Sequence, residues 1–316
     1  MAIWGVTFIS TKILINAGLE PAQIFAIRFT VAYLGIWLLC LRGTRDGSVR
    51  GVSALRLRGL SALRLRGLWA GSVRDELIFV LLGVTGGSMY FLTENTALAC
   101  TQACNVSFIV CSAPLITALL TIFARRVFRG DLAEGLEDVG GRWQLFAGTA
   151  LALCGIAAVT FDGAALQFSA KGDLLALAAA FCWGFYSILM GQMTVRYGTL
   201  FATRKVFFWG LVTIIPWLGG SWPPLQTFAR PEVWGNLLFL SLAASLACFV
   251  LWNKVLSRIG NVTATNYVYL NPLFTLVAAT VFLGETLTLQ SALGCAAILG
   301  GVIIGGLKGG DMKKSI

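Results

Sequence analysis

The chain has 316 residues, of which 57% are hydrophobic and only 12% are charged, and its formal net charge is +10. Because a soluble globular domain carries about 25% charged residues, this composition excludes a water-soluble globule and favours a protein whose apolar side chains face lipid. The sequence contains no histidine, which excludes serine–histidine and cysteine–histidine catalysis and any histidine-ligated metal site. We therefore expect neither an enzyme nor a bound cofactor or metal.

Ten apolar runs are of about the length that a membrane-spanning helix needs, which is roughly 20 residues. In chain order they cover residues 1–16, 21–41, 76–97, 102–124, 143–161, 172–192, 204–220, 234–256, 262–282 and 288–307. The first run is short, so we expect a truncated or misassigned start to the first helix. The prediction is an all-α integral membrane protein with ten transmembrane helices.

The basic residues lie in the loops between these runs, so the positive charge indicates membrane topology and not a nucleic-acid partner. Loops 16–20 and 96–102 contain no basic residue, whereas loops 42–74 and 125–142 contain eight and four. Lys and Arg concentrate on cytoplasmic loops. Even-numbered spans are therefore expected to end in the cytoplasm, with both termini there and the protein in the plasma (inner) membrane.

The basic loop at residues 42–75 contains a duplication, because Ser53–Leu60 recurs without change as Ser61–Leu68. One interpretation is a basic amphipathic segment that lies on anionic membrane lipids. The favoured interpretation is a recent tandem duplication in a tolerant loop.

Short motifs recur in the same order in both halves of the chain, which indicates an internal repeat. The pairs are Phe25–Arg28 with Phe201–Arg204, Trp4-Gly5 with Trp183-Gly184, Phe91, Asn95, Leu98, Pro114, Leu115 and Thr117 with the residues 158 positions later, and Gly148 and Gly155 with Gly294 and Gly301. Each half holds five spans, an odd number, so the second half enters the membrane with the opposite orientation. We predict inverted five-helix repeats at residues 1–161 and 171–307, followed by a cytoplasmic tail at 308–316.

The ordered motifs also resemble the EamA family of the drug/metabolite transporter superfamily, over residues 1–307. The motifs that carry the resemblance are Trp4-Gly5-Val6-Thr7-Phe8, Lys12, Pro21, Phe25-Ala26-Ile27-Arg28, Glu94-Asn95-Thr96-Ala97-Leu98, Asn105-Val106-Ser107, Pro114, Gly172-Asp173-Leu174, Trp183, Asn266–Pro272 and Phe282-Leu283-Gly284-Glu285. The resemblance implies a ten-helix fold with inverted repeats that moves metabolites or amino acids, often outward. One departure is that the fourth span lacks a counterpart of Glu285.

Charged residues within the spans are candidates for transport, because they are costly in lipid and usually face a cavity or a partner. Lys12 lies deep in the first span. Arg28 either attracts a carboxylate-bearing solute or locks helices together through backbone carbonyls, and its counterpart Arg204 is expected to extend to the membrane interface. Glu94 is the best candidate for proton coupling, with an interfacial ion pair as the alternative.

Neutral polar and aromatic residues complete the predicted site, either as contacts to a solute or as links between helices. They are Asn95, Asn105, Asn253, Asn266, Asn271, Trp183, Tyr186 and Tyr267, with Trp252 and Tyr269 as further aromatic candidates. Pro114 and Pro272 occupy matching positions and are expected to kink the fourth and ninth spans.

These observations favour a secondary transporter of small metabolites, amino acids in particular, that works by alternating access. Its partners are a small-molecule solute and membrane lipids, and the sequence leaves open whether it is a monomer or a homodimer. The alternatives are a lipid or nucleotide-sugar translocase of the same superfamily and an integral-membrane enzyme that acts on lipids.

Overall fold

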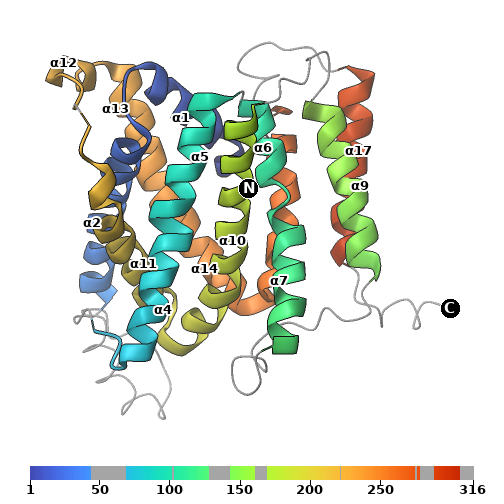
Figure 1. Ribbon diagram of the computed structural model, residues 1–316, viewed down its shortest axis with the longest axis horizontal. Coiled ribbons are helices and arrows are strands. Elements are labelled where there is room, and N and C mark those ends of the chain that lie inside the picture. The colour runs from blue at the N-terminus through green and yellow to red at the C-terminus, as the bar shows by residue number, and fades with distance from the viewer. Residues whose placement is uncertain are drawn as a thin grey trace.

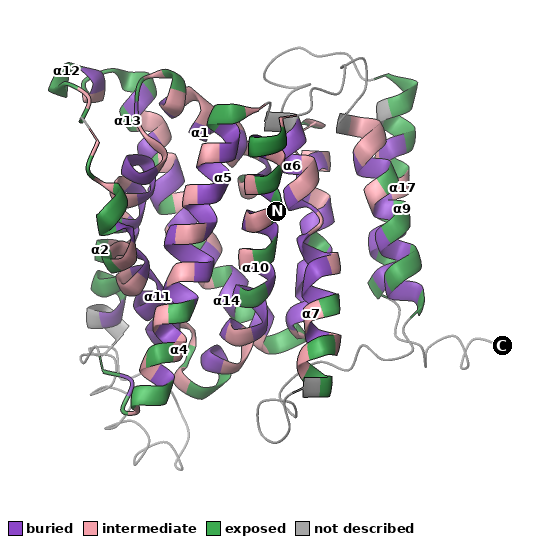
Figure 2. Ribbon diagram, in the orientation of Figure 1, coloured by how far each residue is buried: buried purple, intermediate pink, exposed green. Residues whose placement is uncertain are grey.

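The computed structural model describes residues 1–43, 69–101, 103–127, 143–160, 169–220, 222–274, 276–277 and 288–306. All regular elements in these ranges are helical, and they pack side by side in one bundle (Figure 1). Buried residues lie mainly on the faces that the helices turn toward one another (Figure 2). The duplicated part of the basic loop, Glu285 and the predicted tail lie outside the described residues.

The helices follow the predicted apolar runs in chain order. They are α1 (Ala2–Asn16), α2 (Pro21–Gly43), α4 (Val73–Gly83), η2 (Val84–Ser88), α5 (Met89–Cys100), α6 (Ala103–Val110), α7 (Ala113–Val127), α9 (Trp143–Thr160), α10 (Ala170–Tyr197), α11 (Thr199–Ile214), η3 (Ile215–Trp217), α12 (Leu225–Phe228), α13 (Pro231–Leu238), η4 (Phe239–Ala247), α14 (Cys248–Ile259), α15 (Asn261–Asn266), η5 (Tyr267–Leu270) and α17 (Leu289–Gly306).

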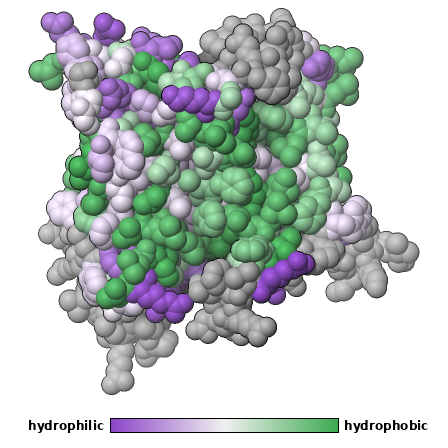
Figure 3. Space-filling model, in the orientation of Figure 1, coloured by the Kyte–Doolittle hydropathy of each residue, from purple (hydrophilic) through white to green (hydrophobic). Residues whose placement is uncertain are grey.

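Six helical segments of the described chain are long and apolar enough to cross a membrane. They are Pro21–Cys40, Val73–Cys100, Asn105–Arg126, Ala170–Tyr197, Thr199–Trp217 and Pro231–Ile259, and three shorter apolar helices cover Ala2–Asn16, Trp143–Val159 and Ala292–Gly306. In Figure 3 apolar side chains fill the middle of the visible face, and the described hydrophilic ones gather toward its two ends. An apolar belt between polar ends is what a bilayer requires of a multi-pass membrane protein.

The expectation for Arg204 is wrong, because α11 begins earlier than the apolar run suggested. Helix α10 ends at Tyr197 and α11 starts at Thr199, with Gly198 alone between them at a φ of 83° that favours glycine. Arg204 therefore lies within α11 and not at its start. The residue is 2% exposed, and its guanidinium is 5.6 Å from the Phe201 ring centroid. Its side chain is therefore packed inside the bundle and does not extend outward.

Two long spans are interrupted by π-helical segments at related positions. The first is Val84–Ser88, where Gly87 has φ −126° and ψ −105°, far from helical values. The second is Phe239–Ala247. The offset of 158 residues that relates the two halves places residues 84–88 on 242–246, within the second π-helical segment. Such segments occur often at functional sites.

Helices α9 and α17 lie side by side (Figure 1) and pack through glycines. A Cβ atom built on Gly148 would lie 2.4 Å from the Gly301 carbonyl oxygen, and one on Gly155 would lie 2.6 Å from that of Gly294. Only residues without a side chain permit this approach. Since the earlier glycine of α9 meets the later one of α17, the two helices run antiparallel.

A cluster of aromatic rings fills the centre of the bundle beside the site. The Phe29 ring is 5.0 Å from Phe91, 5.1 Å from Phe207 and 5.6 Å from Phe249, measured between centroids. These rings come from α2, α5, α11 and α14, so the cluster ties both halves of the chain together. Aromatic pairs at such distances contribute about 0.5–1.5 kcal/mol beyond their buried area.

Candidate functional site

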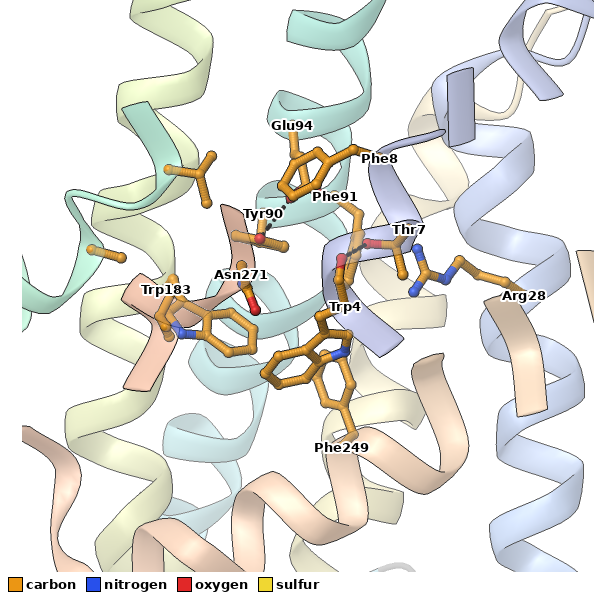
Figure 4. A pocket seen from close by; sticks show the side chains of 13 residues that line it. Trp4, Thr7, Phe8, Arg28, Tyr90, Phe91, Glu94, Trp183, Phe249 and Asn271 are labelled. Carbon is orange, nitrogen blue, oxygen red and sulfur yellow. Dashed lines mark hydrogen bonds between the residues drawn. The ribbon is translucent and has the colours of Figure 1, made fainter. Parts of the chain in front are cut away.

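A small cavity lies in the middle of the bundle, at the point where α1, α2, α5 and α10 meet (Figure 4). It has a volume of about 40 Å³, and its lining consists of Trp4, Thr7, Phe8, Arg28, Tyr90, Phe91, Glu94, Val110, Ala113, Trp183, Phe249, Val268 and Asn271. A water molecule needs about 10–15 Å³ of such space. The cavity as it stands has room for a few waters and none for an organic solute.

Arg28 brings a buried positive charge to this cavity from α2. It is 2% exposed, and its Nε donates a hydrogen bond of 2.8 Å to Ser245 Oγ, which belongs to the second π-helical segment. Its guanidinium carbon is 4.5 Å from the centroid of Phe91, a cation–π distance. Because the side chain is fixed through Nε, its terminal nitrogens are directed toward the cavity (Figure 4).

Glu94 brings the opposite charge from α5. It is 8% exposed, and Tyr90 one turn earlier donates a hydrogen bond of 2.7 Å to its Oε1. Glu94 and Arg28 line the same cavity from different helices, yet neither of the ion pairs found among the described residues joins them. Each charge can therefore meet a group of opposite sign on a solute.

Aromatic rings from both halves of the chain form the apolar wall. Trp4 and Trp183, which begin the two Trp-Gly motifs of the sequence, meet edge to face with ring centroids 5.4 Å apart. Phe249 lies 6.1 Å from Trp4, and Tyr90 lies 5.1 Å from Trp183. The indole Nε1 of Trp4 donates a 3.1 Å hydrogen bond to the carbonyl oxygen of Ala244 in the second π-helical segment.

Four of the predicted site residues, Arg28, Glu94, Trp183 and Asn271, line this one cavity. The structure places the other predicted residues elsewhere in the bundle. Lys12 donates to the Leu98 carbonyl at the end of α5, and Asn95 donates to the Pro21 carbonyl at 3.3 Å. Asn105 donates to Thr101 Oγ1 at 3.4 Å.

The second half contributes a chain of hydrogen bonds outside the cavity lining. Tyr186 donates to Asn253 Oδ1 at 2.6 Å, and Asn253 donates to Thr203 Oγ1 at 2.9 Å. Asn266 donates to a carbonyl of α17, and Tyr267 is 45% exposed.

The two prolines stand beside irregular backbone. Pro114 is the second residue of α7, which follows a two-residue break after α6. Pro272 follows directly on Asn271, after the 3₁₀ turn η5.

Sequence reasoning missed several lining residues. Tyr90 could have been found from its position four residues before Glu94, because residues at that spacing share a helix face. Trp4 was recognised in the repeat but not assigned to the site. Ser245 could not be recognised from the sequence, because its contact with Arg28 depends on the π-helical segment, which was not predicted. Among the described residues, no group of three or more histidine, cysteine or acidic side chains could hold a metal ion.

Comparison with known proteins decides the family. The sequence matches the EamA-like transporter family over residues 1–128 and 170–306. The chain belongs to this family. The match confirms the resemblance and identifies a multi-pass membrane protein of a transporter family.

Relatives of this EamA-like chain are also named as transporters. An "Uncharacterized transporter" of Archaeoglobus fulgidus is 27% identical over 96% of this chain and 93% of its own length. A "Probable terminal-alkyne amino-acid exporter" of Streptantibioticus cattleyicolor is 28% identical over 73% of each chain. A "Probable amino-acid metabolite efflux pump" of Salmonella typhimurium is 28% identical over 50% of this chain and 56% of its own.

A solved crystal structure shares the fold. It superposes with a TM-score of 0.63 at 18% identity, and the match covers 96% of this chain and 94% of the other. At that identity the likeness concerns the fold alone.

Proposed function

We propose that this EamA-like protein is a secondary transporter that exports small metabolites, and amino acids in particular, across the plasma (inner) membrane. The observation that carries the proposal is that Arg28 and Glu94 face one aromatic-lined cavity without pairing with each other. An amino acid has a carboxylate for the guanidinium and an ammonium group for the carboxylate. Charge-assisted hydrogen bonds of this kind are about twice as strong as neutral ones.

The proposed architecture is ten transmembrane helices in two inverted repeats, at residues 1–161 and 171–307. The antiparallel packing of α9 against α17 supports it, because these helices carry matched glycines and would be the fifth helix of each repeat. The π-helical segments at related positions and the Trp4–Trp183 contact support it as well. Inverted repeats allow one central site to open to either side.

The mechanism that follows is alternating access. The central cavity, at about 40 Å³, has room for only a few waters, so the helices around it must separate to admit a solute. Glu94 can hold either a proton or the solute's ammonium group, and competition between the two would couple export to proton entry. The sequence contains no GxxxxGK[ST] loop for nucleotide phosphates, which favours an ion gradient as the energy source.

Both termini are proposed to lie in the cytoplasm. The basis is the count of basic residues in alternate loops. A single cysteine placed at residue 50 or 316, in a variant whose native cysteines are replaced, should react with a membrane-impermeant maleimide only after cells are opened. Reaction in intact cells would refute this orientation.

Solute counterflow in proteoliposomes tests the function. Vesicles that contain the purified protein and an unlabelled amino acid should accumulate the same labelled amino acid from outside, and protein-free vesicles should not. If no proteinogenic amino acid exchanges while a lipid headgroup or a nucleotide sugar does, the translocase alternative replaces the proposal.

A further inference from the structure

One end of the bundle carries a network of charged side chains that is separate from the central cavity. Asp75 and Glu76 stand in the first turn of α4. Arg196, near the end of α10, forms an ion pair of 2.9 Å with Asp75, and the neighbouring Tyr197 hydroxyl also donates to Asp75. Lys205 of α11 pairs with Glu76. We call these five residues the latch.

Both carboxylate oxygens of Glu76 have hydrogen-bond partners in the latch. Trp209 Nε1 donates to Glu76 Oε1 at 2.8 Å, and the backbone N–H of Ala70 donates to Oε2 at 3.1 Å. The Lys205 side chain is 1% exposed and that of Glu76 is 12% exposed. Removing one member of such a pair leaves the other charge buried without compensation, so the contact holds its two helices firmly together.

The latch joins the two halves of the chain. Helix α4 belongs to the first matched segment and α10 and α11 to the second. Helix α4 continues through the π-helical segment Val84–Ser88 into α5, which carries Tyr90 and Glu94 to the central cavity. The non-helical Gly87 therefore lies between the latch and the site, where a change of backbone angle can swing α4 relative to α5.

The charged network of the latch has no matching counterpart in the second half of the chain. Both ion pairs that the structure shows within its described ranges are in the latch. The positions that match Asp75 and Glu76 in the second half, 158 residues later, are Val233 and Trp234, which carry no charge. Ion pairs at one end only give the states open to the two sides of the membrane different free energies.

A second cavity adjoins the latch. Its volume is about 480 Å³, and Asp75, Arg196, Gln192, Leu256 and Asn261 are among its lining residues. It is much larger than the central cavity, of about 40 Å³.

The residues that line the two cavities are separated along the chain by members of the hydrogen-bonded chain of Tyr186, Asn253 and Thr203. On α10, Tyr186 follows Trp183 of the central lining and precedes Ile188 of the second lining. The two linings share no residue, and we call the second cavity, at the latch end, the vestibule.

We infer that the latch is a gate: its ion pairs hold α4 against α10 and α11, and their release lets α4 swing about Gly87 and connect the vestibule with the central cavity. The inference rests on the proposed transport function. The gate must break once in every cycle, and the helix that it holds is continuous with the one that carries Glu94. Restraining the latch therefore stops transport without touching the solute.

The first test measures opening without any solute. A single cysteine at Thr7, in the central cavity, is introduced into protein whose native cysteines are replaced, and its reaction with a charged thiol reagent is timed in proteoliposomes. Glu76→Gln should raise this rate about tenfold, because loss of the buried pair shifts the population toward the open state. Where this change impairs folding, Arg196→Gln replaces it; the Arg196 side chain is 59% exposed, so its loss should raise the rate by a smaller factor, about twofold to fivefold. Lys254→Gln, which removes an exposed cation from the middle of α14, should leave the rate unchanged. Equal rates in all variants would overturn the gate.

The second test joins the latch covalently. Cysteines at Asp75 and Arg196 are bridged with a bifunctional methanethiosulfonate reagent, and counterflow is measured before and after reduction. Transport should stop on bridging and return on reduction, whereas transport at the unbridged rate would overturn the inference. If unmodified protein transports none of the amino acids tested, the proposed function fails, and the thiol-reaction rates still decide the gate.

Discussion

Replacing Arg28 with alanine is expected to lower the initial rate of amino-acid counterflow by about 30-fold or more. Truncating one partner of a buried, hydrogen-bonded charge pair costs about 2–5 kcal/mol, and about 1.4 kcal/mol corresponds to a factor of ten in affinity. The guanidinium is the buried cation that lines the cavity, held through Nε by Ser245 so that its other nitrogens face the cavity. Initial rates in proteoliposomes with matched protein content measure the effect.

Two variants make the Arg28 result interpretable. Arg28→Lys keeps the charge but not the planar fork of donors, so it should retain part of the activity. Arg230→Ala removes an exposed arginine far along the chain and should transport normally. A wild-type rate in Arg28→Ala protein that elutes as a single folded species would remove Arg28 from the solute site and favour its role as a lock between helices.

Glu94→Gln is expected to remove the response of transport to an imposed proton gradient. In the wild type, a gradient of one pH unit across the vesicle membrane should raise amino-acid accumulation against the proton flow by up to about tenfold, because one pH unit corresponds to about 1.4 kcal/mol per proton. Glutamine has nearly the shape of glutamate but cannot exchange a proton, so transport by the variant should be the same with and without the gradient. Labelled flux at several gradient sizes provides the measurement.

Tyr90→Phe is the matched control for Glu94. It removes the hydroxyl that donates to Glu94 Oε1 but leaves the carboxyl group in place. Coupling should therefore persist in this variant, at a changed rate. If Glu94→Gln still responds fully to the gradient, another group carries the proton and Glu94 has a structural role.

Much of the helical organisation was predictable from composition and periodic apolar runs. A run of about 20 apolar residues can satisfy its backbone in lipid only as a helix, and each described run is helical. The residues at which helices begin and end were harder to predict. The start of α11 was missed because residues 199–203 are mixed in polarity and the one-residue turn at Gly198 is set by packing between α10 and α11.

The site was predictable in part. Two charged residues, Arg28 and Glu94, were identified because a charge within an apolar run is costly in lipid and usually faces a cavity or a partner. Trp183 was identified as a large aromatic side chain within such a run. Which way each helix turns is decided by contacts with other helices. The sequence therefore could not separate Asn271, which lines the cavity, from Asn253, which bonds to Tyr186 and Thr203.

The π-helical segments were not predicted at all. They arise where hydrogen bonding shifts by one residue, and no residue type marks that shift reliably. Their consequence for the site is direct, since the second segment supplies both Ser245 and the Ala244 carbonyl that hold Arg28 and Trp4.

The most direct measurement is an experimental structure of the purified protein with an amino acid that passes the counterflow assay. We expect its carboxylate beside Arg28 and its ammonium group beside Glu94, with Trp4 and Trp183 against its side chain and the two repeats inserted in opposite directions. Density for the solute at another place in the bundle, or repeats that point the same way, would contradict the account.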